Sequence, residues 1–397
     1  MAGEGVVIAG GGLAAQRCAE TLRRIGYEGR VRIVCAERHR PYDRPPLSKD
    51  VLADAGAADA VAFRPPDWYA EKSVELLTGV AASGLDAVAH RLALADASTV
   101  GYEHLVIATG SRPRMLAQFA PYENVSTLRT LEDAEGLRGL LQARARLLII
   151  GAGFIGQEVA AAARRGGVEV TVIEAEPLPL HGLLGREIGE WFAQLHRSEG
   201  VELVLGHTTA QIHGGRRVEA VTLDDGRRIE TDHVLVGIGV VPDLDWVEGT
   251  GLQTSGIRTD EGGRSELPGV YAAGDAAACY DTFLERHVLS GHWESAGRQG
   301  AAVAHSIVGR AAPARGLSSF WSDQYGTRIQ YLGHARLADS VVIDGDPAER
   351  DFVAVYHRDS TPVAALIVGR PRALVEMRER LSYITERIPD HDPRPAD

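Results

Sequence analysis

The chain has few of the residues that build disulfide or metal sites. Its 397 residues contain three cysteines and no C-x-x-C pair, which excludes a redox-active disulfide or a zinc cluster of that kind. Cys18 and Cys35 fall on an expected core helix and core strand, so we interpret both as small buried hydrophobes. The fourteen histidines include no H-x-x-x-H pair. We therefore expect no metal.

Long apolar runs and excess basic charge are also missing. No run of about 18 apolar residues occurs, so we expect no transmembrane helix and no membrane partner. The first residues lack the basic region of a signal peptide, and we expect a cytoplasmic protein. The formal net charge of −12 argues against a nucleic-acid partner. The length predicts two or three domains with a large core, and the oligomeric state stays open.

The chain does contain two glycine-rich dinucleotide-binding motifs, each behind an apolar strand and ahead of a helical pattern. Residues 10–15 read G-x-G-x-x-A, and residues 151–156 read G-x-G-x-x-G. Such glycines permit a tight turn, a close approach to a pyrophosphate and close helix–strand packing. We expect two adenine dinucleotides bound at once, with electrons passing between them. The expected contacts are Gly10, Gly12, Leu13, Ala14 and Ala15 in the first motif, and Gly151, Gly153, Phe154, Ile155 and Gly156 in the second.

An acidic residue ends the second strand of each unit. Glu37 follows the strand at 31–36, and Glu174 follows the strand at 168–173. Both lie where a carboxylate accepts hydrogen bonds from a ribose diol. Glu176 follows closely, so a 2′-phosphate would meet two carboxylates, and we expect NADH rather than NADPH.

The order of the motifs predicts an α/β fold with an interrupted layout. Two Rossmann-like dinucleotide-binding domains, at 1–110 with 237–317 and at 111–236, precede a C-terminal α/β domain at 318–397, as in the three-domain architecture of glutathione reductase. The segment 269–275 is expected to return as a strand to the first domain and to place Asp275 before a helix that starts near Ala276. The C-terminal domain alternates as an antiparallel sheet does, and a helix at about 373–388 and a loose tail at 389–397 are expected to follow.

Several further segments carry a family resemblance. Residues 42–49 (Y-D-R-P-P-L-S-K), 108–110 (A-T-G), 271–275 (Y-A-A-G-D) and 320–324 (F-W-S-D-Q), together with the two motifs, resemble the NADH-dependent ferredoxin reductases. These enzymes serve bacterial cytochromes P450 and Rieske ring-hydroxylating oxygenases. The resemblance spans nearly the whole chain. It implies that the first motif and domain take FAD, and that the inserted domain takes NADH.

The resemblance also implies roles for single residues. Lys49, one of only two lysines, would lie beside the flavin and pair with Glu158 as the catalytic ion pair. Asp275 would bind FAD near its ribityl and pyrophosphate, the alternative being a helix N-cap. Arg44 and Pro45 would form a stiff corner beside FAD, the alternative being a surface turn. The other residues expected at a cofactor are Ala108, Thr109, Gly110, Arg129, Gly237, Ile238, Gly239 and Gly274.

Two tryptophans complete the expected site. Trp321 would pack near the flavin on the side away from the nicotinamide, the alternative being a plain core tryptophan. Trp293 stands where relatives often have arginine, which leaves open how the pyrimidine edge of the flavin is bound. A backbone N–H of Trp293 or Glu294 is the candidate.

The expected activity is that of a ferredoxin–NAD(+) reductase. Because the chain has no ligand set for an iron–sulfur cluster, the 2Fe–2S ferredoxin must be a separate chain that docks on a local basic patch. The patch candidates are Arg64, Lys72, Arg298, Arg310 and Arg315. Rubredoxin reductase, monodehydroascorbate reductase and a NADH-sensing flavoprotein like apoptosis-inducing factor stay open. A thiol-based NADH oxidase or a coenzyme A-disulfide reductase would need a cysteine near residues 47–49, and none is there.

Overall fold

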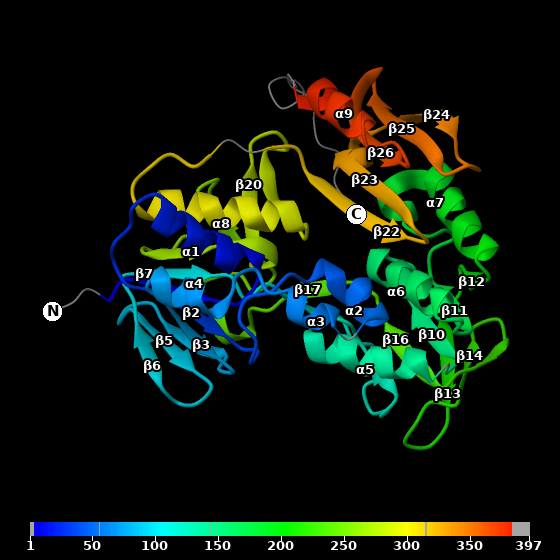
Figure 1. The fold of residues 1–397 in the computed structure, drawn as a ribbon, viewed down its shortest axis with the longest axis horizontal. Helices are drawn as coiled ribbons and strands as arrows, with labels where there is room; N and C mark the ends of the chain where they lie inside the picture. The colour runs from blue at the N-terminus through cyan, green and yellow to red at the C-terminus, as the bar shows by residue number, and fades with distance from the viewer. Residues whose placement is uncertain (1–3, 55, 144, 314–315, 383–397) are drawn as a thin grey trace.

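The computed structural model describes residues 4–54, 56–143, 145–313 and 316–382. The described residues form three units, each built around one five-stranded sheet (Figure 1). Arg315, the end of the expected helix at 373–388 and the expected tail at 389–397 lie outside the described residues. No described helix is long and apolar enough to cross a bilayer.

The first unit is a five-stranded parallel sheet in the order β19-β7-β1-β2-β3. Its strands are short apolar runs buried on both faces, as parallel strands covered on both sides are. Helices α1 and α8 pack together on one face, and the small sheet β4-β5-β6 lies on the other side. The bounds are β1 Val6–Ala9, α1 Leu13–Arg24, β2 Val31–Cys35, β3 Val74–Thr78, β4 Ala82–Asp86, β5 Arg91–Leu94, β6 Thr99–Gly101, β7 His104–Ile107, β19 Val270–Ala272 and α8 Trp293–Ile307.

The second unit repeats this plan with strand order β12-β11-β10-β16-β9, all parallel. A two-stranded antiparallel ribbon, β8 with β17, carries the chain from the first unit into the second and back. The bounds are β8 Ser111–Pro113, β9 Val125–Ser126, α5 Leu131–Gln142, β10 Leu147–Ile150, α6 Phe154–Arg165, β11 Val170–Glu174, α7 His181–Ser198, β12 Glu202–Leu205, β13 Thr209–His213, β14 Ala220–Leu223, β15 Arg228–Glu230, β16 His233–Val236 and β17 Val240–Pro242.

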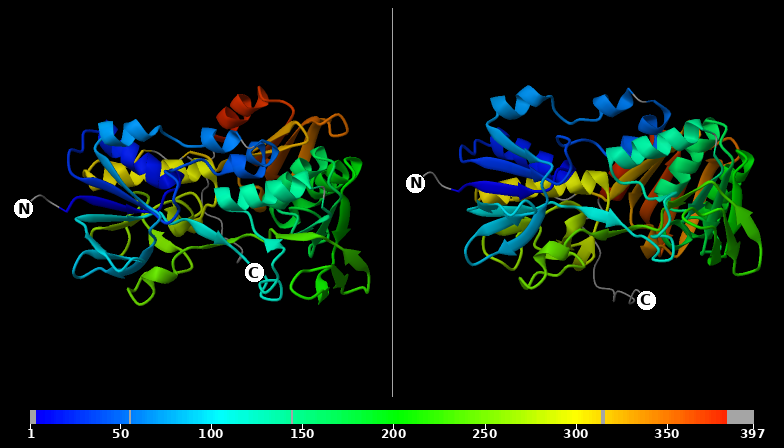
Figure 2. Two further views of the ribbon diagram at one scale, coloured as in Figure 1. Left: turned by 60° about the horizontal axis from the view of Figure 1, so that its bottom comes forward. Right: turned by 90° about the horizontal axis from the view of Figure 1, so that it is seen from below.

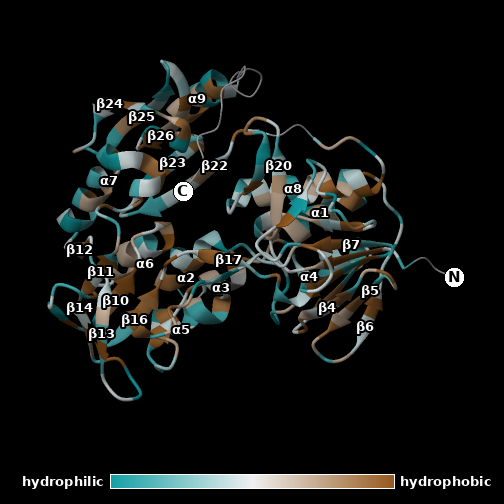
Figure 3. Ribbon diagram, turned by 180° about the vertical axis from the view of Figure 1, so that it is seen from behind, coloured by the Kyte–Doolittle hydropathy of each residue, from teal (hydrophilic) through white to brown (hydrophobic). Residues whose placement is uncertain are grey.

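The third unit is the expected antiparallel sheet, in the order β22-β23-β26-β25-β24. One face packs on α7, through Ile188 and Phe192, and the other face packs on α9, through Met377 and Leu381. Apolar residues predominate in β25 and β26, the strands that are almost wholly buried (Figure 3). The bounds are β22 Ser319–Gln324, β23 Thr327–Gly333, β24 Ser340–Asp346, β25 Asp351–Arg358, β26 Thr361–Val368 and α9 Ala373–Ser382.

The second and third units lie side by side at one end of the molecule, and the first unit lies at the other (Figure 2). The segment between β2 and β3 crosses from the first unit toward the second. It contains η1 Pro45–Ser48, α2 Asp50–Ala53, α3 Ala57–Ala60 and α4 Pro66–Glu71. Helix α2 packs against α5, and η1 packs against α6. The motif at 42–49 is thereby placed beside the second dinucleotide motif.

One expectation about the fold is wrong. Strand β19 does return to the first sheet, where it pairs with β7, but no helix starts near Ala276. A single turn at Gly274–Ala276 leads into the strand Ala277–Asp281 (β20). That strand pairs with Ile257–Thr259 (β18) and Arg286–Leu289 (β21), and α8 starts only at Trp293. Pairing with β18 on one side and with the hairpin strand β21 on the other overrides the helical preference of the alanines at 276–278.

Two histidines are buried as neutral rings. His196 is 0% exposed and His233 is 5% exposed, and burial lowers the pKa of each to about 4. The unfolded chain takes up protons near pH 6.5, whereas the folded chain does not until about pH 4. Stability is therefore lost as pH falls through this window.

We expect this linkage to be measurable by urea unfolding at pH 7 and pH 5. Each histidine contributes about 2 kcal/mol to the loss of stability between these pH values. Between pH 7 and pH 5, the His233→Asn variant should lose about 2 kcal/mol less stability than the unaltered chain. The control His287→Asn, at an exposed position, should lose as much stability as the unaltered chain. An equal loss in all three proteins would contradict the assignment.

Candidate functional site

The first glycine motif forms an open turn between β1 and α1. Gly10 has φ of +128°, and a Cβ there would lie 2.0 Å from the Ala108 carbonyl oxygen, so only glycine fits. Gly12 is extended, and a Cβ there would meet no protein atom within 4 Å. Helix α1 begins at Leu13 with no side-chain cap and no acidic residue in its first turn. Open space before uncapped backbone N–H groups fits a pyrophosphate.

The second motif repeats this geometry between β10 and α6. Gly151 has φ of +103°, and a Cβ there would lie 2.5 Å from the Gly237 carbonyl oxygen. A Cβ at Gly156 would lie 2.3 Å from the Gly151 carbonyl oxygen, which is the close helix–strand packing expected from the motif. Gly153 has open space, with only one atom 3.9 Å from an added Cβ. Ile155 beside it is 44% exposed. This turn also fits a dinucleotide.

Both acidic residues lie at the expected strand ends, and the protein itself orients them. The Glu37 carboxylate accepts hydrogen bonds from the Tyr42 hydroxyl at 2.5 Å and from Arg44 Nη2 at 2.8 Å. The Glu174 carboxylate accepts the backbone N–H of Ala152 at 2.6 Å, inside the second motif. Each carboxylate is thus fixed next to its turn, and its role toward a ribose stays a prediction.

Two arginines and Asp275 meet beside the first turn. Arg44 Nη1 donates to the carbonyl oxygen of Arg129 at 2.5 Å, and Arg129 Nη2 donates to Asp275 Oδ2 at 3.2 Å. Ser111, which the sequence did not single out, donates to the same oxygen at 2.6 Å. Burial and the nearby Arg44 lower the pKa of Arg129, whose buried Nε has no partner among the described residues. An anionic group fits this concentration of cationic donors.

The remaining predicted contacts surround these groups. Ala108, Thr109 and Gly110 follow β7, and the residues 237–239 follow β16, so both sets lie at the carboxyl ends of central strands. Ligands of open α/β sheets bind at such ends. A Cβ at Gly110 would lie 3.3 Å from Arg129 Nη2. The backbone N–H of Gly274 donates to Gln299 Oε1 at 2.7 Å.

The expected ion pair forms where the three units meet. Lys49 Nζ lies 2.6 Å from Glu158 Oε2, and the two side chains are 13% and 4% exposed. Two serines that the sequence did not single out donate hydrogen bonds to the Glu158 carboxylate. Ser48 donates to Oε2 at 2.5 Å, and Ser322 donates to Oε1 at 2.6 Å. Residues from η1, α6 and β22 therefore converge on one buried carboxylate.

The two tryptophans form a pair. Their ring centroids lie 5.5 Å apart with the planes at 76°, an edge-to-face contact. Trp293 Nε1 donates to Asp43 Oδ1 at 2.6 Å, a contact across 250 residues for which the sequence holds no signal. Arg328 lies over the Trp321 ring, 5.4 Å from its centre. Both tryptophans are half-buried.

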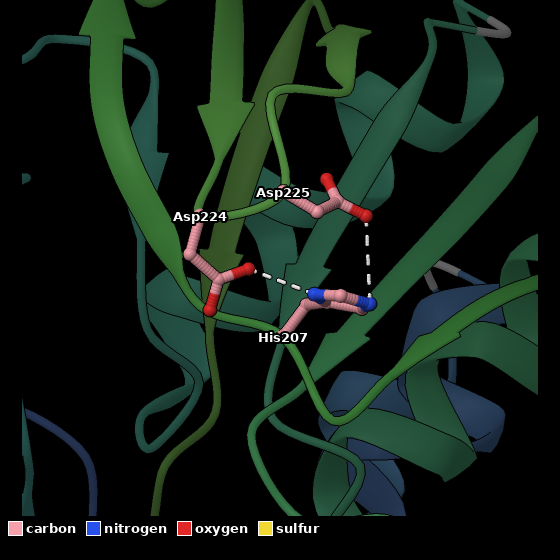
Figure 4. A group of neighbouring side chains, drawn as sticks. All are labelled: His207, Asp224 and Asp225. Carbon is pink, nitrogen blue, oxygen red and sulfur yellow. Dashed lines mark hydrogen bonds and ion pairs between the residues drawn. The ribbon is translucent and has the colours of Figure 1, made fainter.

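One group away from this site has the composition of a metal site. His207 lies between two carboxylates, with Nδ1 2.7 Å from Asp224 Oδ1 and Nε2 3.4 Å from Asp225 Oδ2 (Figure 4). Both ring nitrogens thus face carboxylate oxygens. The hydrogen bond from His207 lowers the pKa of Asp224. We interpret the group as an ion-pair triad.

The docking candidates differ in their surroundings. Arg64 pairs with Glu20 at 2.7 Å, and Glu20 also pairs with Arg17. In the same way Glu294 pairs with both Arg298, at 3.1 Å, and Arg378, at 3.5 Å. Each glutamate is thus shared by two arginines. The two triads extend from α1 and α8, which pack together. Lys72 and Arg310 are exposed.

The comparisons with known proteins agree with this geometry. Residues 4–300 match the family "Pyridine nucleotide-disulphide oxidoreductase", and residues 319–392 match "Reductase C-terminal". Putidaredoxin reductase of Pseudomonas putida is 33% identical over 98% of this chain and 93% of its own. The reductase subunit of a benzene 1,2-dioxygenase system from Pseudomonas putida, named a ferredoxin–NAD(+) reductase, is 37% identical over 92% and 90%.

A solved structure extends the likeness to three dimensions. The crystal structure of the covalent putidaredoxin reductase–putidaredoxin complex matches with a TM-score of 0.92 and 32% identity, over 97% of this chain and 94% of that one. The match includes both dinucleotide units and the C-terminal sheet, because almost the whole chain is covered. The chain therefore belongs to the pyridine nucleotide-disulphide oxidoreductase family and shares the three-domain fold of its ferredoxin reductases.

Proposed function

We propose that this chain is an FAD-dependent NADH:ferredoxin oxidoreductase, which passes electrons from NADH through FAD to a 2Fe–2S ferredoxin that serves a cytochrome P450 or a Rieske-type oxygenase. The observation that carries the proposal is the Lys49–Glu158 pair. It joins the segment that follows the first dinucleotide turn to the helix that follows the second, at 2.6 Å. The relatives' names supply the acceptor, because they are reductases of ferredoxin-dependent systems.

We assign the cofactors to the two turns. Gly10, Gly12 and the start of α1 would hold the pyrophosphate of FAD, with Arg44 and Asp275 beside it. Gly151, Gly153 and the start of α6 would hold the pyrophosphate of NADH. The division into an FAD domain at 1–110 with 237–317, a NAD domain at 111–236 and a C-terminal domain at 318–397 is part of this proposal. So is a cytoplasmic location.

Bound FAD supplies the chemistry that takes two electrons from NADH and passes them on one at a time. The chain supplies position and charge. Lys49 is held by Glu158 and would place its ammonium beside the bound flavin, where negative charge develops during the reaction. Phe154 packs against Phe320 with ring centroids 4.7 Å apart, which joins the start of α6 to the C-terminal sheet.

The runner-up functions use the same layout. A rubredoxin reductase, a monodehydroascorbate reductase and a NADH-sensing flavoprotein would all need both turns. Thiol chemistry has no support, because all three cysteines are buried and Cys18, Cys35 and Cys279 lie outside the segment at 47–49. Burial raises the pKa of the Cys18 thiol to about 12, which makes it a poor nucleophile.

The nucleotide preference follows from Glu174 and Glu176. We expect kcat/KM for NADH to exceed that for NADPH by about 5- to 150-fold, because a 2′-phosphate would meet carboxylates. Arg164, on the nearby helix, donates to the carbonyl oxygens of Glu199 and Val168. These hydrogen bonds occupy the Arg164 guanidinium, so it is not available to bind a 2′-phosphate. Steady-state kinetics with both nucleotides give the ratio, and a value below one would refute the preference.

The candidate basic patch predicts how reduction of the acceptor depends on salt. An acidic ferredoxin is steered toward positive charge, and about 0.1–0.15 M salt screens this steering beyond about 8–10 Å. We expect the rate of ferredoxin reduction to fall as ionic strength rises, whereas ferricyanide reduction should follow a different profile. Arg310→Glu should raise the KM for ferredoxin and leave NADH reduction of FAD unchanged. Salt profiles that coincide for both acceptors would contradict the proposed docking.

A further inference from the structure

A buried polar network lies between α6, α7 and β22. Its members are fully or almost fully buried: His196 and Ser322 are 0% exposed, Gln324 is 1% exposed and Gln157 is 2% exposed. His196 Nε2 lies 3.0 Å from Gln157 Oε1 and 3.0 Å from Gln324 Oε1. His196 Nδ1 lies 2.8 Å from the hydroxyl of Tyr325. One imidazole therefore contacts residues of two different units.

The contacts of His196 define its tautomer. Both partners of Nε2 are amide oxygens, which only accept, so Nε2 carries the proton. Nδ1 then accepts from the Tyr325 hydroxyl. Burial lowers the pKa of His196 to about 4, so the ring is neutral at pH 7. Because Nε2–H donates to both glutamines, both amides are turned with their NH2 groups away from the ring.

The two NH2 groups point toward two different parts of the expected NADH site. Gln157 Nε2 donates to the carbonyl oxygen of Ala152 at 2.8 Å, inside the second glycine turn. The N–H of the same Ala152 is held by Glu174. Glu174 and the first arm therefore hold the two peptide groups that flank the Ala152 Cα.

The second arm ends at the reacting end of the site. Gln324 Nε2 donates to Ser322 Oγ at 3.1 Å, and Ser322 Oγ donates to Glu158 Oε1 at 2.6 Å. Glu158 holds Lys49 on its other oxygen. Hydrogen bonds, joined through the backbone of Ala152, thus connect Glu174 with Lys49, and His196 is the branch point.

We propose that His196 is a positioning residue for NADH. Its ring orients Gln157 toward the nucleotide turn and Gln324 toward Glu158, and the Tyr325 hydroxyl, by donating to Nδ1, stabilises the tautomer that allows both. The inference deepens the proposed function and rests on NADH as the substrate. If Nδ1 carried the proton instead, Nε2 would accept, and both amides would have to turn. The amide oxygen of Gln157 would then face the carbonyl oxygen of Ala152. Ser322 Oγ would lose the hydrogen bond that it accepts from Gln324 Nε2.

The arms predict separable effects. Gln157→Met removes the donor to Ala152 and one of the two acceptors of His196 Nε2–H, which keeps Gln324 Oε1 as its other acceptor. It should therefore weaken NAD+ binding to the oxidised protein about tenfold, with little change in the limiting rate of flavin reduction. Ser322→Ala removes the donor to Glu158 and the acceptor of Gln324 Nε2–H, both on the second arm. It should therefore slow the limiting rate about tenfold with little change in NAD+ affinity. Tyr325→Phe, which acts on the branch point, should change both quantities.

The tautomer supplies a readout that does not depend on turnover. The 15N chemical shifts of the His196 ring should report the Nε2–H form in the unaltered protein and a mixture of both tautomers in Tyr325→Phe. Tyr102→Phe is the matched control, because its buried hydroxyl has no partner among the described residues, and this change should leave all three quantities unaltered.

The variants separate a positioning role from a purely structural one. Tyr325→Phe with an unchanged tautomer, or with unchanged NAD+ affinity and reduction rate, overturns the proposal. Equal losses in the Gln157 and Ser322 variants would overturn it too, because the network would then only stabilise the fold. Failure of NADH to reduce the unaltered protein would instead refute the proposed function, whereas the tautomer in the two tyrosine variants would still test the network by itself.

Discussion

Replacing Gly12 with valine is expected to give a folded protein that has lost FAD. Gly12 is extended, with φ of −89° and ψ of −172°, so a side chain causes no backbone strain there. An added Cβ meets no protein atom within 4 Å, so nothing in the fold has to move. The new methyl groups would fill the space where the pyrophosphate must approach the start of α1. FAD content should fall at least about tenfold, while the circular dichroism spectrum stays that of the unaltered protein.

Gly153→Val is the matched control, because Gly153 occupies the same position in the second turn and is equally open. This variant should keep its FAD and its yellow colour, yet NADH should no longer reduce it at a normal rate. If both variants keep FAD, or if Gly153→Val loses FAD and Gly12→Val does not, the assignment of the two turns is wrong.

Replacing Lys49 with methionine is expected to slow the reduction of the flavin by NADH about 100-fold while FAD stays bound. The side chain has nearly the same length, but the ammonium that pairs with Glu158 at 2.6 Å is lost. Removal of one charged or hydrogen-bonding group that faces developing charge costs about 10²–10³ in rate. The midpoint potential of the flavin should fall, because the reduced form loses its nearby cation. Stopped-flow absorbance and a spectroelectrochemical titration measure the two effects.

Lys72→Met is the natural control, because Lys72 is the other lysine of the chain and is exposed at the end of α4. It should reduce at the rate of the unaltered protein. Lys49→Met with an unchanged reduction rate would make Lys49 an ordinary structural residue, and the pair with Glu158 would then serve the fold alone.

Local patterns predicted much of this molecule because its chemistry is concentrated in short motifs. Gly10 and Gly151 must be glycine for steric reasons that the motif itself contains. Lys49 and Glu158 were paired through the family resemblance, and the structure confirms the contact. The antiparallel C-terminal sheet followed from alternation along its strands. The prediction of a helix after Asp275 was wrong because this segment pairs with β18 on one side and forms a hairpin with β21 on the other, and the alanines at 276–278 do not reveal that pairing.

The contacts that the sequence did not predict join residues far apart in the chain. Ser322 reaches Glu158 across 164 residues, and Tyr325 reaches His196 across 129. Serine, glutamine and tyrosine are common on surfaces, so nothing in their local sequence marks them as buried donors. Only the packing of the C-terminal sheet against α6 and α7 brings them together.

Anaerobic stopped-flow with NADH and a choice of acceptors tests the central claim most directly. The protein, reduced by NADH, should transfer electrons rapidly to at least one 2Fe–2S ferredoxin from a cytochrome P450 or Rieske oxygenase system, with much slower transfer to rubredoxin and to quinones. The opposite order, with every 2Fe–2S ferredoxin inert and rubredoxin or a quinone reduced fast, would contradict it.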